Sequence, residues 1–429
     1  MALRILFYCD HADFKDVTKF TTTTVARVLT ASGFTVHTVN RTDKPTPLID
    51  STLLSDYDEV WFFLASTEDD SKLSDDERAA LNVWMDAGHG ILLTGDHTEE
   101  IPGSGVGKTT YKGLGAPIGR LIPRAGALRE WDKPPTNLSA QFATSGGDTP
   151  TTGDPERDAT PQRLLITRFD GKVHPIFDDR PRVLDRLPDH PHEGKVYAPK
   201  SSELKPSDRW PVNSSTPQFI ASGIDWDAGV ATPCMVAWED EKTSFGRIVA
   251  DTSWHHYVDY NLKDIATDDN PHWPKIRQLY INLAKWLAPS KVRQGFLGKV
   301  LISMRSNSNW KLAHQSLERI GASARGGLAA RLGGPWMMEI DSDLLALHGI
   351  NLGTEKLPPE FADHLLGAYL CDQDGPTGAY DDAAHQVTAP HAHKACLDRA
   401  VDSYKKILTD RQSLLDRLLG LGGDPPKPG

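Results

Sequence analysis

The stretch from residue 88 to residue 97 is the sequence feature that most constrains how this chain can fold. Its short apolar run, bracketed by glycines, is typical of a strand buried on both faces of a parallel sheet. The run leaves through Gly95 into two titratable residues, Asp96 and His97. Ligands of open parallel sheets bind beyond the carboxyl ends of the strands, so this pair is a candidate site.

The segment before this strand predicts a helix over residues 74–85. Ser74 and Glu77 have the spacing of a capping box, in which each side chain hydrogen-bonds to the other residue's backbone. Leu81 and Met85 then lie on one face at helical spacing. The helix therefore leads directly into the buried strand.

Apolar strands alternate with helical patterns over most of the chain. Strands are expected at residues 4–9, 34–39, 58–64, 91–94, 164–169, 218–221, 234–238 and 246–251, and helices at 17–31 and 273–287. Such alternation gives right-handed βαβ units. We therefore predict one α/β domain over residues 1–290, a doubly wound and mainly parallel sheet with residues 91–94 in a central strand.

The pattern becomes helical after Pro289. A chain of 429 residues is longer than one core usually serves, so a second domain is expected. Helices are predicted at residues 310–332, with an interruption at Gly326-Gly327, and at 359–370 and 390–419, before a disordered Pro/Gly-rich tail. We assign residues 291–429 to a helical C-terminal domain. The apolar stripe of its last helix serves either homo-oligomer assembly or packing within its own domain.

Charge and cysteine content narrow the class of partner. The formal net charge of −11 argues against nucleic acid and anionic membrane surfaces, which require a basic footprint. The four cysteines are widely separated and form no CxxC pair, so they are expected to be free thiols in a reducing compartment. No signal-peptide pattern or membrane-length apolar run occurs. We expect a cytoplasmic protein that acts on a small molecule.

The glycine-rich run GSGVGKTT at residues 103–110 resembles a phosphate-binding P-loop. The P-loop requires a glycine where Pro102 stands, and it lies between a strand and a helix. Here the nearest predicted strand ends several residues earlier. A glycine-rich loop over the site is the favoured interpretation.

Histidines and carboxylates occur together in three segments. These are Asp96-His97, the DHPHE run at residues 189–193, and residues 251–259. In an extended chain, residues two apart lie on the same side, so His190 and His192 can bind the same ion or substrate. Two of the segments follow predicted strands at one sheet edge. The three are therefore expected to converge on one pocket.

His255 and His256 are neighbours and would point apart on a strand. At least one of them is expected in the pocket. Each segment also has a simpler interpretation: Asp96 as a helix cap, residues 190–192 as a solvated turn, and residues 254–256 as core packing with a hydrogen-bonded imidazole.

The candidate site residues are assigned three roles. Acid–base catalysis is assigned to Asp96, His97, His255 and His256, substrate binding to Asp10, His11, Arg124 and Arg129, and metal binding to His97, His190, His192 and His255. Asp10 and His11 follow the first strand, which is expected to neighbour the central one. The arginines can clamp an anion or form a solvated basic face.

Residues 1–290 resemble the class I glutamine amidotransferase-like superfamily, particularly its uncharacterised bacterial ThuA-like branch. The matching runs are RILFY at 4–8, LSDYDEVW at 54–61, residues 73–95, HPI at 174–176 and GRIV at 246–249. The resemblance implies a flavodoxin-like fold. Amidotransferases carry a nucleophilic cysteine where this chain has Asp96-His97, so no glutaminase activity is expected.

Two functions remain open. One is a hydrolase or lyase with a His/Asp site acting on a small polar or anionic substrate, either with a divalent metal, zinc first, or by metal-free acid–base catalysis. The other is a non-catalytic small-ligand sensor or scaffold whose helical domain mediates assembly or signalling.

Overall fold

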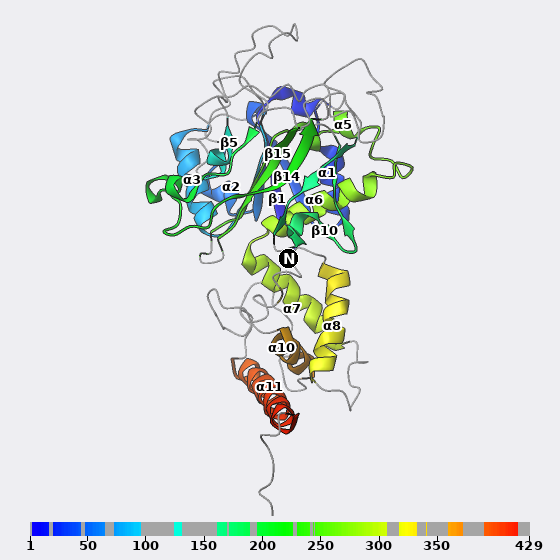
Figure 1. Cartoon of the computed structure of the whole chain (residues 1–429). Helices are drawn as coiled ribbons and strands as arrows, with labels where there is room; N and C mark the ends of the chain where they lie inside the picture. The colour runs from blue at the N-terminus through cyan, green and yellow to red at the C-terminus, as the bar shows by residue number, and fades with distance from the viewer. Residues whose placement is uncertain are drawn as a thin grey trace, which may run out of the picture. The chain divides into compact units, whose positions relative to one another are not determined.

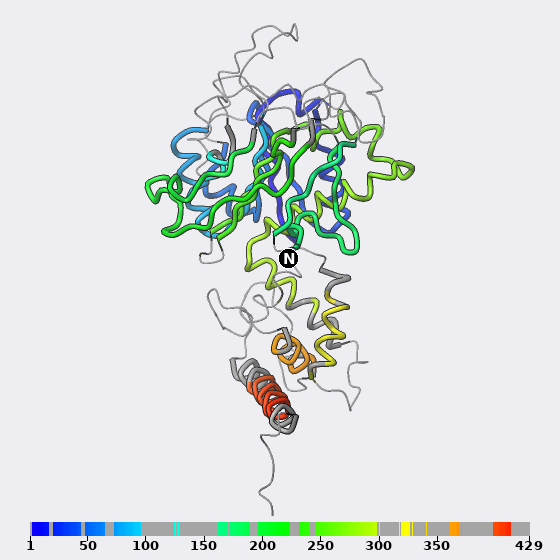
Figure 2. Tube along the Cα trace, in the orientation of Figure 1, coloured from blue at the N-terminus to red at the C-terminus, as the bar shows by residue number. Residues whose placement is uncertain are grey.

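The computed structural model of the chain describes fifteen segments. They are residues 2–16, 20–43, 48–64, 73–95, 124–130, 161–169, 171–188, 195–225, 230–240, 243, 245–306, 317–332, 340, 359–371 and 390–418. Figure 2 follows the path of the chain, coloured from the N-terminus to the C-terminus. The chain divides into two compact units, Ala2–Val292 and Arg293–Gly429, the second also including Met1.

The first unit is built on an eight-stranded sheet in the order β2-β1-β3-β4-β16-β15-β14-β7 (Figure 1). In that order the strands are Thr35–Asn40, Arg4–Cys9, Glu59–Phe63, Gly90–Leu93, Ile248–Asp251, Val230–Trp238, Gln218–Asp225 and Leu165–Ile166. The first five are joined by parallel pairing and the last three by antiparallel pairing. The predicted α/β class with a mainly parallel sheet is confirmed, and β4 is internal as expected.

The parallel half reverses its winding direction between β1 and β3. β1 pairs with β2 on one side and with β3 on the other, and the chain then proceeds outward through β4 to β16. In doubly wound sheets, ligands bind at the carboxyl edge beside this reversal. The expectation that β1 neighbours β4 was wrong, because β3 lies between them.

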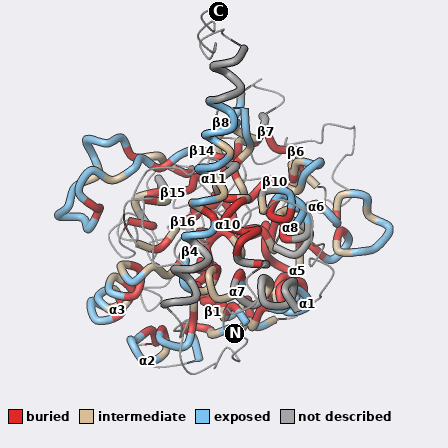
Figure 3. The backbone as a smooth tube through the Cα atoms, turned by 90° about the horizontal axis from the view of Figure 1, so that it is seen from below, coloured by how far each residue is buried: buried red, intermediate tan, exposed pale blue. Residues whose placement is uncertain are grey.

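Helices cover both faces of the parallel half. Figure 1 shows α1 (Thr23–Ala31) and α6 (Trp273–Leu287) on one face, and α2 (Ser51–Leu54) and α3 (Asp75–Asp86) on the other. Figure 3 shows exposed residues on α2 and α3 at the rim of the view, while buried residues gather towards its middle. The bounds of α6 match the prediction, because apolar side chains at a 3.6-residue period are buried along its whole length.

The predicted capping box of α3 is confirmed, and its glutamate does more than cap. Glu77 also accepts hydrogen bonds from the buried Arg41 and from the backbone N–H groups of Leu48 and Ile49. Burial acts to raise the pKa of Glu77, but these hydrogen bonds and that from Ser74 outweigh it and lower the pKa. Glu77 thereby ties α3 to the segment that follows β2.

Two predicted elements differ in the structure. A helix was expected over residues 17–31, but α1 begins at Thr23, and the described residues 20–22 are not helical. The β-branched Thr21 and Thr22 disfavour helix and lie just before its first residue. The strand expected at 164–169 is two separate two-residue strands, β7 and β8 (Arg168–Phe169).

The other described elements of this unit are small ladders and short helices. The ladders pair β8 with β9 (Lys172–Val173), β10 (Asp178–Asp179) with β11 (Arg182–Val183), β12 (Arg186–Leu187) with β6 (Gln162–Arg163), and β13 (Lys195–Val196) with β5 (Arg129–Glu130). The short helices are η1 (Ala12–Lys15), η2 (Arg41–Asp43), η4 (Ala125–Leu128), η6 (Pro175–Phe177), η7 (Ser201–Glu203), η8 (Pro206–Asp208), η9 (His255–Tyr257) and α5 (Asp259–Leu262).

The described part of the second unit is helical. Helix α7 (Ser290–Ser306) crosses the division between the units, and α8 (Leu317–Leu332), α10 (Pro359–Cys371) and α11 (Pro390–Leu418) follow. The expected interruption at Gly326-Gly327 was wrong, because α8 continues through both residues. Its buried residues Ile320, Ala324 and Leu328 keep helical spacing across the glycines, and packing outweighs the low helix propensity of glycine. None of the described helices is long and apolar enough to cross a membrane.

Candidate functional site

Among the described residues, the best-defined cluster of titratable side chains at the carboxyl edge of the sheet lies at the end of β16. The strand ends at Asp251, and the Thr252 N–H still donates to the Cys234 carbonyl (3.0 Å). The chain then turns through η9 and α5. Because the chain turns, both His255 and His256 point into the protein interior and are buried.

Asp251 is the centre of this cluster. Its carboxylate lies 2.9 and 3.0 Å from His256 Nδ1 and accepts a 2.9 Å hydrogen bond from the Tyr257 hydroxyl. A carboxylate only accepts, so the His256 Nδ1 must carry its proton, and Nε2 carries the lone pair of the neutral ring. Burial, and then the charge of Asp251, raise the pKa of Tyr257 and of Cys234 well above their usual ranges.

His255 has a separate partner. Its Nδ1 lies 3.0 Å from Asn261 Oδ1, and its ring stacks on Trp254 with 3.8 Å between ring centroids. With the amide oxygen as acceptor, Nδ1 again carries the proton. Both histidines are thus fixed in one orientation, and the same contacts satisfy the core-packing interpretation.

The turn that carries the two histidines packs on the α1/α6 face of the sheet. The Tyr280 hydroxyl, on α6, donates a 2.6 Å hydrogen bond to the His256 carbonyl. The Tyr257 ring lies 5.5 Å from that of Phe63 and 6.1 Å from that of Trp61, both on β3. The turn therefore reaches back across β4 to the strand beside the winding reversal.

The segment that follows β1 lies against the same turn. Phe14 packs edge-on against Trp254, with ring centroids 5.6 Å apart, and Phe20 does so at 4.5 Å. Asp10 is buried, and its N–H donates to the Phe63 carbonyl (3.3 Å), while His11 Nδ1 accepts from the Asp13 N–H (3.2 Å). The exits of β1 and β16 therefore meet at one edge of the sheet.

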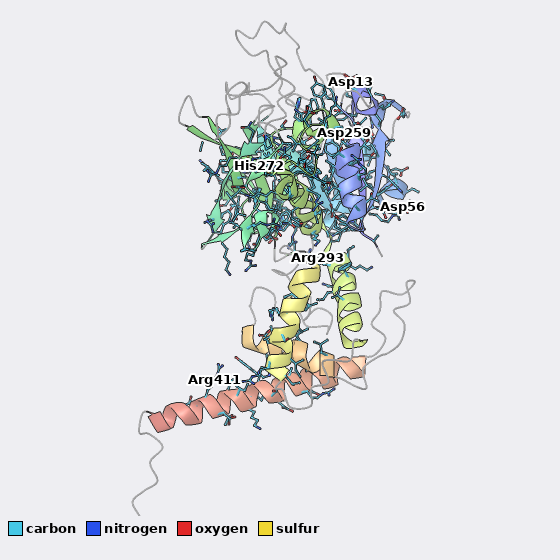
Figure 4. All side chains as sticks on the ribbon, turned by 90° about the vertical axis from the view of Figure 1, so that its right-hand side faces the viewer. Asp13, Asp56, Asp259, His272, Arg293 and Arg411 are labelled. Carbon is cyan, nitrogen blue, oxygen red and sulfur yellow. The ribbon has the colours of Figure 1, made fainter. Side chains whose placement is uncertain are left out.

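The amino end of α1 is filled by a carboxylate from this turn. Asp259 accepts a 2.8 Å hydrogen bond from the Thr24 N–H and a 2.7 Å bond from the Thr21 hydroxyl. The Asp259 N–H donates to the Thr21 carbonyl at 2.6 Å. Figure 4 shows Asp13 and Asp259 towards one end of the sheet, with Asp56 nearer the other. A chain carboxylate thus occupies the position at which helix amino ends bind anions.

Arg124 lies away from this edge. Its buried guanidinium donates to Asp86 at the end of α3 (2.7 Å) and to the Arg209 carbonyl (2.9 Å). It also lies over the ring of Phe245, at the amino end of β16. The structure therefore does not bring Arg124 together with the histidines, and its charge is held by Asp86. The Arg129 side chain lies outside the described part, although its backbone forms β5.

The remaining candidates lie in segments that the structure does not describe. These are Asp96, His97, His190 and His192, together with the P-loop-like run at residues 103–110. Among the residues that are described, no group of three or more His, Cys, Asp or Glu is arranged to hold a metal ion. The predicted convergence of all three histidine segments stays a prediction.

Asn261 and Tyr280 contact the histidines from outside the 251–259 segment that the sequence singled out. Asn261 follows His255 by six residues, and only its nearness in the chain could have indicated it. Tyr280 lies 24 residues beyond His256, on a helix whose aromatic residues all fit core positions. No sequence signal distinguishes the hydrogen-bonding tyrosine from its neighbours.

Comparison with known proteins finds distant structural neighbours. No protein-family model matches the chain, and no curated protein matches it. Among solved structures, the mmIFT52 N-terminal domain aligns at 15% identity with a TM-score of 0.37, covering 66% of this chain and 96% of that one. A ThuA-like protein from Bacteroides uniformis aligns at 12% identity with a TM-score of 0.31, covering 66% of this chain and 91% of that one.

Proposed function

We propose that the Ala2–Val292 unit is a hydrolase or lyase that acts on a small polar substrate at the carboxyl edge of its sheet. The Asp251–His256 hydrogen bond is the observation that carries this proposal. A carboxylate on Nδ1 orients the imidazole and stabilises its protonated form, so Nε2 can take a proton from a substrate and return it. The winding reversal between β1 and β3 supports the location, two strands from β16.

We further propose that this unit belongs to the ThuA-like branch of the class I glutamine amidotransferase-like superfamily. The parallel order β2-β1-β3-β4-β16 is the flavodoxin-like order that the resemblance implies. A cytoplasmic location is proposed with it. Cys9 and Cys234, the cysteines whose side chains the structure describes, are free thiols, as expected in a reducing compartment.

The proposal includes a divalent metal, with zinc as the favoured ion. The expected ligands are His97, His190, His192 and His255. For His255, the hydrogen bond from Nδ1 to Asn261 supports this, because metal-binding histidines typically donate their other ring N–H to an oxygen. A bound metal would supply an activated water. Elemental analysis of untagged protein, with His97→Ala as the comparison, tests this assignment.

The second candidate is a non-catalytic ligand sensor or scaffold. The burial of the two imidazoles favours it, since His256 is 0% exposed and His255 is 3% exposed. A proton-transfer group must come within hydrogen-bond reach of its substrate. In this candidate the cluster stabilises the turn, and a ligand binds at the sheet edge without turnover.

Turnover by matched variants separates the two candidates. Purified full-length protein is assayed with p-nitrophenyl acetate and p-nitrophenyl phosphate, followed by a wider panel of esters, amides and small hydroxy acids. His256→Asn keeps an N–H donor for Asp251 but removes acid–base chemistry, so a loss of about 10²–10⁴-fold is expected. His37→Asn, at an exposed histidine on β2, is the control. A folded His256→Asn protein with the wild-type rate would overturn the catalytic proposal. Saturable binding of one of these small molecules without turnover would support the second candidate, the ligand sensor.

A further inference from the structure

The three hydrogen bonds of Asp259 join two segments that are far apart in the sequence. Thr21 and Thr24 lie at the start of α1, and Asp259 lies at the start of α5, more than 230 residues later. The cap residue of α1, Thr22, makes no side-chain capping hydrogen bond. The amino end of α1 therefore receives its side-chain cap from another element, and the same contact holds α5 in place.

Helix α5 also supplies the residue that holds His255. Asp259 and Asn261 lie two residues apart on this four-residue helix. Asn261 is fully buried, and its amide oxygen faces His255 Nδ1. A single turn of helix is not stable by itself, because it makes too few internal hydrogen bonds to offset its loss of conformational entropy. Its position must come from its contacts.

We infer that Asp259 is a positioning residue, which fixes α5 on α1 so that Asn261 holds His255 in its Nδ1–H tautomer. The inference rests on the proposed function only for the role of that tautomer as a base or a metal ligand. In that state, His255 Nε2 carries the lone pair required of a base or a metal ligand. His256 does not depend on this link, because Asp251, on β16 itself, orients it.

The tautomer of His255 can be measured without a substrate. Full-length protein labelled with ¹⁵N-histidine gives long-range ¹H–¹⁵N spectra that distinguish the Nδ1–H ring, the Nε2–H ring and their fast exchange. In wild-type protein, His255 is expected as the pure Nδ1–H form. In Asp259→Ala it is expected as an exchanging mixture, with amide hydrogen exchange over residues 255–263 faster by about tenfold or more.

Matched variants separate positioning from a general loss of stability. Asp259→Asn retains an oxygen for the Thr24 N–H, and the Thr21 hydroxyl can accept from its new amide, so the wild-type spectrum is expected. Asp268→Ala, at an exposed position in the same loop, should also leave the spectrum unchanged. Asn261→Ala is the positive control and should produce the mixed tautomer.

A second variant keeps the test decisive if Asp259→Ala does not fold. Thr21→Val removes one of the three bonds with little change in volume and should give a smaller shift in the same direction. A pure Nδ1–H signal for His255 in either folded variant, with unchanged exchange over residues 255–263, would overturn the inference. Because neither readout uses turnover, failure of the proposed enzyme activity would be distinguishable from this result.

Discussion

Glu59 is a fully buried carboxylic acid at the start of β3. Its Oε2 accepts a 2.9 Å hydrogen bond from Trp61 Nε1, whereas Oε1 has no hydrogen-bond partner among the described residues. Burial raises the pKa of Glu59 well above its usual range. The folded state therefore holds the proton more tightly than the unfolded state does. Stability from this group is complete below the unfolded pKa and is lost as the pH rises towards the folded pKa.

We expect Glu59→Gln to remove this pH dependence. The amide keeps an oxygen for Trp61 but carries no charge to bury, so the variant should gain stability over wild type as the pH rises from 5 to 8. The gain is at most about 1.4 kcal/mol per pH unit. Urea unfolding at several pH values measures it, with Asp268→Asn as the exposed control. Parallel stability curves for Glu59→Gln and wild type would contradict the argument.

At the residue scale, the sequence indicates which side chains carry the chemistry more readily than it indicates their hydrogen-bond partners. His255, His256 and Asp251 could be grouped because they lie close together in the chain. The long-range hydrogen bonds could not be predicted, because no local pattern indicates that Asp259 caps a helix more than 230 residues earlier. For Arg124, its spacing from other arginines suggested an anion clamp, but Asp86 already neutralises its charge.

At the scale of the element, alanine is expected to have opposite effects on stability at two glycines of α8. A Cβ added at Gly321 would lie 1.9 Å from the Asp363 carbonyl oxygen of α10, and one added at Gly326 would meet nothing within 4 Å. Gly321→Ala must therefore force the helices apart, at a cost of about 1–3 kcal/mol. Gly326→Ala should stabilise α8 by about 0.5–1 kcal/mol, because alanine has the higher helix propensity.

Hydrogen exchange of the α8 and α10 amides in the full-length chain measures both changes. Exchange should be faster in Gly321→Ala and slower in Gly326→Ala. Equal effects in the two variants would show that backbone conformational freedom, rather than the close approach of α8 and α10, determines the tolerance for a side chain.

Elements with a clear period were predicted well, and those without one were not. The capping box fixed the start of α3, and the 3.6-residue stripe fixed both ends of α6. The two-residue strands between residues 162 and 196 are too short to show any alternation, and their pairing depends on partners elsewhere in the chain. The continuity of α8 through Gly326 depended on packing, which propensity alone does not report.

The division into two units raises the question of what the helical unit contributes to the whole molecule. On α11, Ala400 is buried, and Tyr404 packs on Phe361 and His364 of α10, with ring centroids 5.4 and 5.8 Å away. This part of the apolar stripe is therefore used within its own unit. Leu408, one turn further along, is 47% exposed. The packing alternative thus accounts for the beginning of the predicted stripe, Ala400 and Tyr404, and leaves the exposed Leu408, which lies beside the stripe, for assembly.

We expect the full-length chain to self-associate through α11 and a chain ending at residue 292 to be monomeric. An isolated helical segment is marginal in water unless its apolar face is covered, so the exposed part of α11 gains stability from a second copy. Sedimentation velocity at several concentrations measures the oligomeric state of wild-type protein, the truncated chain and Leu408→Glu. The glutamate variant should dissociate at concentrations at which wild type is associated, while Lys405→Glu, at an exposed residue outside the stripe, should not. If wild type is oligomeric and the truncated chain keeps that state, the assembly contacts lie in the Ala2–Val292 unit, and α11 serves only its own domain. A monomeric wild-type chain would contradict the prediction.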